Sequence, residues 1–201
     1  MQIRRLEPLS EPYKVNSIAD VYRKAYGGIP WNEGFVCPLC KKDFPLISDS
    51  KLCPECEKKS RKVLLVDYWP ISKVVSDFYR EMQKPEAICI VVEEGVYVVG
   101  FAWGYRVTAN PELNEQLDAP GLSDLIKDDF FYLDECALEP AFQGVGIGRM
   151  LIRRILEEKL QKRVLLRTLN DSPMYSLAKR FGCETVQRIS RGRVIMTSIT
   201  T

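Results

Sequence analysis

Four of the seven cysteines stand in two closely spaced pairs that could hold a metal ion. The pairs read Cys37-Pro-Leu-Cys40 and Cys53-Pro-Glu-Cys56, and twelve residues separate them. Each pair can present two thiolates to one tetrahedral ion, and four thiolates leave no open coordination position. Because the sequence contains no histidine, such a site must be all-cysteine. We predict a structural zinc site; iron on the same ligands, or disulfide bonds, are the alternatives.

The segment that carries these cysteines, residues 36–62, resembles a zinc ribbon. It is too short to fold alone without a metal ion. Its end, residues 58–62, reads Lys-Lys-Ser-Arg-Lys. This positive run could contact RNA or an acidic partner, or it could simply be a solvated face.

A glycine-rich turn between a strand and a helix is the second candidate site. The apolar, aromatic run 130–138 predicts a strand, and Pro140 ends it because proline has no N–H to donate. The turn Gln143-Gly-Val-Gly-Ile-Gly-Arg149 follows, and apolar residues then recur at helical spacing. Free N–H groups and the helix dipole at such a turn attract anions, and glycine lets a phosphate approach closely. The alternative is a turn that only packs the helix on the strand.

Several common types of site are excluded. A P-loop ends in Gly-Lys-Ser/Thr, whereas Gly148 is followed by Arg149 and Met150. The glycine spacing and its late position also fail the dinucleotide fingerprint. Without histidine there is no Ser-His or Cys-His pair, so acid–base work falls to carboxylates, tyrosine, lysine, cysteine or water.

The Gln-x-x-Gly-x-Gly pattern of the turn, with Glu135-Cys-Ala-Leu-Glu-Pro140 before it, resembles the pyrophosphate-binding signature of the GNAT superfamily of acyl-CoA-dependent N-acyltransferases. The predicted element order matches as well: strand, two helices, three strands, glycine turn, helix, strand, helix, two strands. The resemblance implies an α/β fold over residues 1–201, with a mixed, mostly antiparallel sheet flanked by helices. The zinc ribbon would be inserted between the first and second helices.

The same resemblance implies an N-acetyltransferase that moves an acetyl group from acetyl-CoA to a primary amine by direct attack. The amine would belong to a small cationic compound, or to a protein lysine or N-terminus. By this resemblance, the strand backbone would hold the pantetheine and the thioester oxygen, the turn would hold the pyrophosphate, and an asparagine would stand at the mouth of the gap. The strand residues are Cys136, Ala137 and Leu138. The turn residues are Gln143, Gly144, Val145, Gly146, Ile147, Gly148 and Arg149, and the asparagine is Asn170.

The resemblance also nominates catalytic residues. Glu135 matches a glutamate that acts as a base through water in some members. The position of the usual tyrosine acid is Ala178 here, and Tyr175, one turn earlier, is the substitute candidate. A second glutamate of some N-terminal acetylating members is replaced by Leu165. Members of this superfamily usually transfer the acyl group directly from CoA to the amine, which argues against a covalent intermediate on Cys136.

Composition places few further limits. The chain has 201 residues, 46% of them hydrophobic, and a formal charge of +2, so no bulk attraction to nucleic acid follows. No apolar run approaches the ~20 residues needed to span a bilayer, and the first residues lack a signal-like apolar core. We expect a cytoplasmic protein.

The alternative to an enzyme is a sensor that binds acyl-CoA without turnover and docks RNA or a protein through its ribbon.

Residues 109–129 form the most acidic stretch, with six acids against one lysine. We predict irregular structure there. Since it leads into the strand before the glycine turn, we expect it to form an acidic lip beside the reacting end of a bound cosubstrate, favouring a cationic acceptor. A solvated loop is the alternative.

Overall fold

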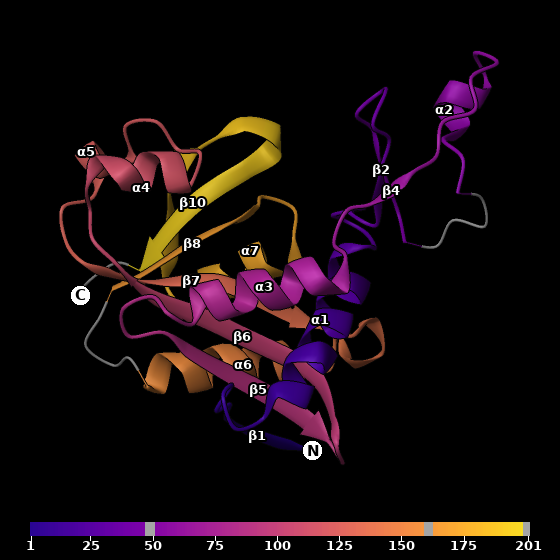
Figure 1. Cartoon of the computed structure of the whole chain (residues 1–201). Helices are drawn as coiled ribbons and strands as arrows, with labels where there is room; N and C mark the ends of the chain where they lie inside the picture. Colours follow the sequence, from indigo (N-terminus) through magenta and orange to yellow (C-terminus); the bar gives the residue numbers. More distant parts are fainter. Residues whose placement is uncertain (47–50, 159–162, 199–201) are drawn as a thin grey trace.

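The computed structural model describes residues 1–46, 51–158 and 163–198 and contains one large sheet (Figure 1). The strand order is β1-β5-β6-β7-β8-β10-β9, and all neighbours are antiparallel except β7 and β8. The strands are β1 (Gln2–Arg5), β5 (Ile88–Glu94), β6 (Tyr97–Val107), β7 (Phe130–Leu138), β8 (Arg163–Leu169), β9 (Cys183–Arg188) and β10 (Arg193–Ser198). The predicted mixed, mostly antiparallel sheet is confirmed.

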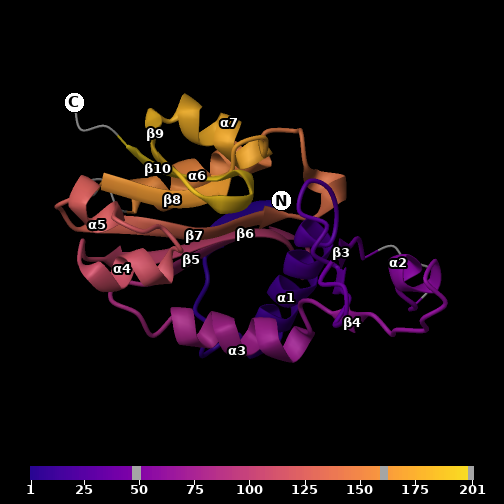
Figure 2. The same ribbon diagram turned by 90° about the horizontal axis from the view of Figure 1, so that it is seen from above.

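Helices cover both faces of this sheet. Helices α1 (Pro12–Tyr26) and α3 (Ile71–Glu81) lie on one face, and α6 (Ile147–Glu157) and α7 (Pro173–Arg180) lie on the other (Figure 2). The strands supply both layers because successive side chains point to opposite faces. In β5, for example, Ile90 packs into the core under α6, while Val91 packs into the core under α1 and α3.

The cysteine-rich segment forms a small unit that projects from the end of α1 (Figure 1). It consists of β2 (Phe35–Val36), β3 (Asp43–Phe44), the short helix α2 (Pro54–Glu57) and β4 (Val66–Asp67), and its three-stranded sheet has the order β3-β2-β4. Because β4 pairs with β2, this unit extends past residue 62. We call residues 35–67 the ribbon, of which 47–50 lie outside the described residues.

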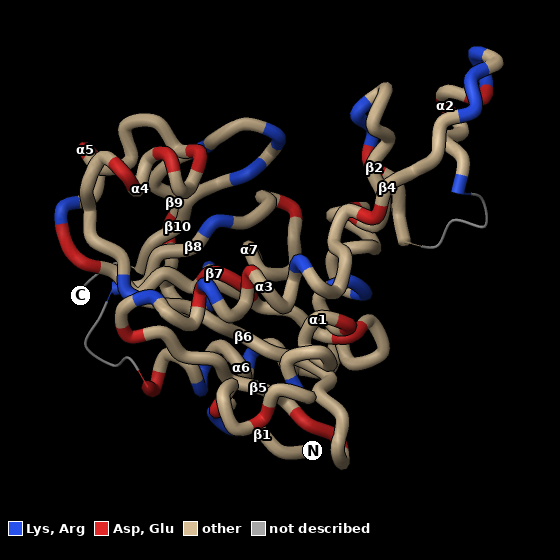
Figure 3. The backbone as a smooth tube through the Cα atoms, viewed as in Figure 1, with Lys and Arg blue, Asp and Glu red and all other residues tan. Residues whose placement is uncertain are grey.

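Residues 109–129 are more regular than predicted, since they hold α4 (Pro111–Gln116) and α5 (Leu122–Leu125). The Asn110 side chain caps α4 by accepting the N–H of Leu113. Leu113, Leu117 and Leu122 are buried in a third core cluster, together with residues of β6, β7, β8 and β10. The signals were a cap, a proline and spaced leucines, which the high acid content obscured. Figure 3 shows the acids of α4 and α5 on the side of the molecule away from the ribbon.

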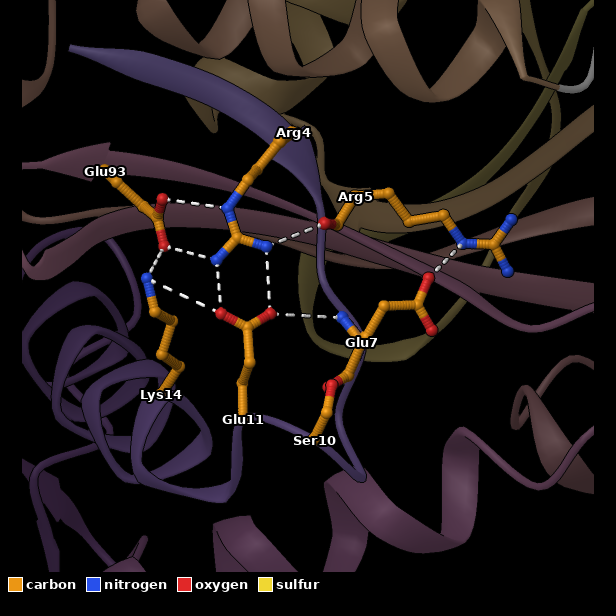
Figure 4. Close-up of polar contacts among 7 residues, drawn as sticks. All are labelled: Arg4, Arg5, Glu7, Ser10, Glu11, Lys14 and Glu93. Carbon is orange, nitrogen blue, oxygen red and sulfur yellow. Dashed lines mark hydrogen bonds and ion pairs between the residues drawn. The ribbon is translucent and has the colours of Figure 1, made fainter.

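Four charged residues tie β1, α1 and β5 together (Figure 4). Arg4 donates to both carboxylate oxygens of Glu93 at 2.9 Å and to both of Glu11 at 2.6 and 2.9 Å. Lys14 makes a further ion pair with Glu93. Burial would raise the pKa of Glu93, but the hydrogen bonds from Arg4 and Lys14 outweigh it and hold the pKa below its ordinary value.

We expect Glu93→Gln to lower the free energy of unfolding by about 3 kcal/mol, because it leaves the two cations short of a buried partner. A carboxyl whose pKa is lowered by folding contributes stability above its ordinary pKa, and this contribution is lost as the pH falls through the folded value. Urea denaturation at pH 7 and at decreasing pH measures both effects. Glu157→Gln, which breaks an exposed pair with Arg154, should change stability by less than about 1 kcal/mol. Equal effects of the two variants would contradict this prediction.

Candidate active site

A cavity of about 1070 Å³ opens where β7 and β8 separate. The two strands pair in parallel from Phe130 and Arg163 as far as Leu133 and Leu166. No pairing between them continues beyond this point in the described residues, and the cavity is lined by the chain that follows on each strand. Its lining runs from the glycine turn on the α6 face to the end of α1 on the opposite face.

A β-bulge at Asp134 marks the start of this gap. Trp103 of β6 stands opposite Glu135, but the next residue, Gly104, stands opposite Leu133, so Asp134 is the extra residue of β7. The bulge breaks the alternation of the strand: both acids face α1, where Trp103 Nε1 donates to Asp134 at 3.1 Å. Cys136 then packs on the α6 face. Two successive carboxylates are therefore placed in one cavity.

Glu135 is held by two tyrosines of α1. Tyr22 donates to its Oε1 at 3.1 Å, and Tyr26 donates to its Oε2. Burial, and next the charge of Asp134, raise the pKa of Glu135 to about 8, although both hydrogen bonds act to lower it. Burial also raises the pKa of Asp134, to about 6. Glu135 thus titrates near neutral pH, as a general base should.

The glycine turn is open to the other end of the cavity. Gly144 and Gly146 have φ of 78° and 92°, and a Cβ built on either would meet nothing within 4 Å. Gly146 is the N-cap of α6, so the free N–H groups of the first helical turn face open space. Gln143 Nε2 donates to the carbonyl of Leu138 at 3.0 Å, which fastens the turn to the end of β7.

Most of the predicted site residues are brought together. Those that line the cavity are Glu135, Cys136, Ala137, Leu138, Gln143, Gly144, Gly146, Gly148 and Arg149. Two residues of the turn lie outside this lining, since Val145 is exposed and Ile147 is buried in the core. Their predicted contribution is through the backbone N–H, which does not depend on where the side chain points.

Two other predicted residues do not line the cavity. The backbone N–H of Asn170 donates to the carbonyl of Gly192 at 3.0 Å. The ring of Tyr175 packs against the core, with the Lys179 ammonium 5.4 Å from its centroid. Neighbouring residues of this region do line the cavity, among them Thr168, Ser172, Met174 and Ser176. Ser172 also caps α7 by accepting the N–H of Tyr175.

The residues that sequence analysis missed form the wall around Glu135. Tyr22 and Tyr26 come from α1, Trp31 and Glu33 precede the ribbon, and Tyr68 and Trp69 follow it. Arg167 of β8 and Arg193 of β10 line the same cavity. One signal was present: aromatic residues stand on both flanks of the cysteine segment.

The expected acidic lip is absent from the cavity. No residue of 109–129 is among those that line it. The leucines of this segment bury it against the far end of the sheet, so its acids lie elsewhere. The carboxylates that face the cavity are Glu33, Asp134 and Glu135 instead.

The four cysteines of the ribbon cluster tightly, with all their sulfur atoms within 4.8 Å of one another. Cys37 Sγ lies 3.7 Å from Cys56 Sγ, and Cys40 Sγ lies 3.6 Å from Cys53 Sγ. Tetrahedral zinc with bonds of ~2.3 Å separates its sulfur ligands by about 3.8 Å, whereas a disulfide bond is about 2.05 Å long. All seven cysteines are free thiols. The geometry fits a closed four-thiolate metal site and not two disulfides.

The fold, the strand gap and the glycine turn are those that the resemblance to the GNAT superfamily implies, and comparison with known proteins agrees. Residues 56–183 match the model of the acetyltransferase (GNAT) family. The chain therefore belongs to the GNAT acetyltransferase family. No curated protein matches the chain in sequence.

Solved structures of low sequence identity share this fold. PH1933 from Pyrococcus horikoshii OT3 has a TM-score of 0.62 at 16% identity, covering 100% of this chain and 98% of its own. The PaiA N-acetyltransferase from Thermoplasma acidophilum, solved in complex with coenzyme A, has a TM-score of 0.56 at 12% identity, covering 99% and 98%. The ribosomal-protein-S18-alanine N-acetyltransferase from Escherichia coli has a TM-score of 0.54 at 13% identity, covering 100% and 96%.

Among the described residues, no helix is long and apolar enough to cross a membrane.

Proposed function

We propose that the protein is an N-acetyltransferase that moves an acetyl group from acetyl-CoA to a primary amine by direct attack. The observation that carries this proposal is the single cavity that joins the open N-terminus of α6 to Glu135. One end is suited to phosphates, and the other holds a carboxylate that titrates near neutral pH.

Each part of the lining has a distinct role in this mechanism. The free N–H groups from Gly144 to Arg149 bind the pyrophosphate, and the edge of β7 from Cys136 to Leu138 binds the pantetheine. The N–H of Leu138 stabilises the negative charge that develops on the thioester oxygen. Glu135 removes a proton from the ammonium, directly or through water, and the neutral amine then attacks the carbonyl carbon of the thioester. The carbon–sulfur bond breaks, and the CoA thiolate leaves with the second proton, which the nitrogen loses as the amide forms. Cys136 takes no part, since burial raises its pKa to about 12 and keeps it a thiol.

We further propose that the ribbon binds one structural zinc ion through Cys37, Cys40, Cys53 and Cys56. Four thiolates fill the coordination shell, so they leave no position for water or substrate. The ion contributes the folding energy that so small a unit lacks. Metal analysis of the purified protein distinguishes zinc from iron on these ligands.

The direct test is product detection by mass spectrometry after incubation with acetyl-CoA and a panel of amines. The panel contains polyamines, aminoglycosides, amino acids and lysine peptides. Thiol reagents are avoided because the protein has seven cysteines. An acetylated amine establishes the activity. Tight acetyl-CoA binding without any product would favour the sensor, whose ribbon would dock RNA or a protein.

Gly146→Leu is expected to weaken acetyl-CoA binding at least about 100-fold while the fold survives. The new side chain would occupy the open space above the first turn of α6 and strain a backbone at φ 92°. Calorimetry measures the loss. Gly95→Leu is the matched control, since Gly95 also has positive φ and open surroundings but lies in the β5–β6 hairpin, away from the cavity. Unchanged affinity in Gly146→Leu would refute the assignment of the phosphate site.

A further inference from the structure

Arg167 of β8 lines the part of the cavity that contains Glu135. Strand β8 alternates: Leu166 packs under α6 and α7, while Leu165 packs on the opposite face. Arg167 therefore projects on the face of Leu165, which is the face that Glu135 and α1 occupy. It stands one residue beyond the last pair of β7 and β8, Leu133 with Leu166. This register places it across the gap from the bulge.

The guanidinium of Arg167 retains most of its donors. Its Nη1 donates to the carbonyl of Leu117 at 3.1 Å, and none of the ion pairs found among the described residues involves it. Arg193 differs, since its Nη2 lies 3.5 Å from Glu33 Oε1. A guanidinium carries five N–H donors, so Arg167 can present a fork to a ligand in the cavity it lines. A carboxylate matches that fork.

The opposite wall suits an amine with an apolar body. The rings of Tyr26 and Trp31 are 5.2 Å apart, as are those of Tyr22 and Trp69 and those of Tyr68 and Trp69. These aromatic side chains line the cavity around Glu135. Such a surface packs against aliphatic or aromatic groups and also favours a cation. We call the part of the cavity around Glu135 the acceptor chamber. It offers an anionic contact at Glu135, a cationic contact at Arg167 and an apolar wall of aromatic rings.

We propose that the acceptor is a free amino acid with an apolar or aromatic side chain, and that Arg167 binds its carboxylate while its amino group lies at Glu135. This inference rests on the proposed acetyl transfer and names the substrate class of that site. It makes Arg167 a specificity-determining residue, because amines without a carboxylate leave its fork unpaired.

The test compares acceptors that differ only by the carboxylate: phenylalanine with 2-phenylethylamine, and leucine with 3-methylbutylamine. Binding to the CoA-saturated protein is measured by calorimetry, and turnover is measured as kcat/KM. In the unmodified protein, at least one amino acid should bind about 10- to 100-fold more tightly than its amine, as expected for charged hydrogen bonds. Arg167→Met should abolish this ratio, and Arg167→Lys should keep part of it because the charge remains without the fork.

The matched control is Arg163→Met, which removes an exposed arginine from the same strand. Arg163 pairs with Asp128 at 2.5 Å and lies outside the cavity lining, so the ratio should be unchanged. Amines that bind and react as well as their amino acids would overturn the inference and leave the acetyltransferase standing. Selective binding of amino acids without any product would support the role of Arg167 and reject the proposed function. A ratio unchanged in Arg167→Met would also overturn it.

Discussion

Glu135→Gln is expected to acetylate the acceptor about 10²- to 10⁴-fold more slowly than the unmodified protein, with acetyl-CoA binding retained. Glutamine has nearly the shape of glutamate. Its amide oxygen accepts the hydrogen bond of one of the two tyrosines, Tyr22 and Tyr26, and its NH2 group can donate to the hydroxyl oxygen of the other, so the side chain is still held in place. It cannot take up the proton of an ammonium. The loss therefore falls on kcat, and single-turnover kinetics with a fixed acceptor measures it.

The pH dependence sharpens this prediction. A base acts in its deprotonated form, so kcat/KM should rise with pH and level off above the Glu135 pKa of about 8. Tyr26→Phe removes a hydrogen bond that favours the carboxylate, so the rise should move to higher pH. Asp134→Asn removes a neighbouring negative charge, so the rise should move to lower pH.

These opposite shifts distinguish a base from a residue that only supports the fold. A damaged fold would lower activity at every pH without moving the rise. If Glu135→Gln retained both its rate and the rise near pH 8, the base would lie elsewhere. Asp134, with a pKa of about 6 and a place in the same bulge, would then be the next residue to test.

The open glycine turn could be predicted from the sequence because its signals are local. Strand β7, the glycine turn and α6 follow one another without interruption, and each shows its own pattern of apolar residues, proline or glycine. The two cysteine pairs are equally local. Sequence spacing alone therefore indicated the open turn at Gly144 and Gly146 and the clustering of the four sulfurs.

The part of the cavity around Glu135 could not be predicted in the same way, because its parts are distant in the sequence. Tyr22 of α1, Trp69 between β4 and α3, and Arg167 of β8 meet only in the folded chain. The bulge at Asp134 has no sequence marker, yet it turns Glu135 toward α1. Tyr175 shows the converse: its position in the helix was predicted correctly, but the rotation of α7 directs it away from the cavity.

Removal of the metal ion that we propose for the ribbon is expected to impair acceptor recognition while leaving acetyl-CoA binding intact. The two flanks of the ribbon supply one wall of the acceptor chamber, through Trp31 and Glu33 on one side and Tyr68 and Trp69 on the other. The ribbon holds these flanks together, because β2 pairs with β4 and the N–H of Tyr68 donates to the carbonyl of Gly34. The glycine turn of α6 belongs to the other face of the sheet, and no hydrogen bond found among the described residues joins it to the ribbon.

Leu46 of the ribbon packs closely against the residues that follow α1. A Cβ on Gly34 would lie 2.2 Å from the N atom of Leu46, and a Cβ on Gly27 would lie 2.7 Å from the Cβ of Leu46. A displacement of the ribbon would therefore also displace the residues that follow α1. A displacement of about 1 Å in a substrate-positioning wall can lower kcat/KM by ~10²-fold.

The measurement uses the full chain before and after treatment with a chelator, together with Cys40→Ser. Both should release about one metal ion per chain and lower kcat/KM for the acceptor by ~10²-fold, while the Kd for acetyl-CoA changes by less than about 2-fold. Leu39→Ser, an exposed change between the first pair of ligands, should do neither. Added zinc should restore the chelated protein but restore Cys40→Ser less completely, because one ligand is missing. Full acceptor recognition in the metal-free protein would show that the wall stands without the ribbon.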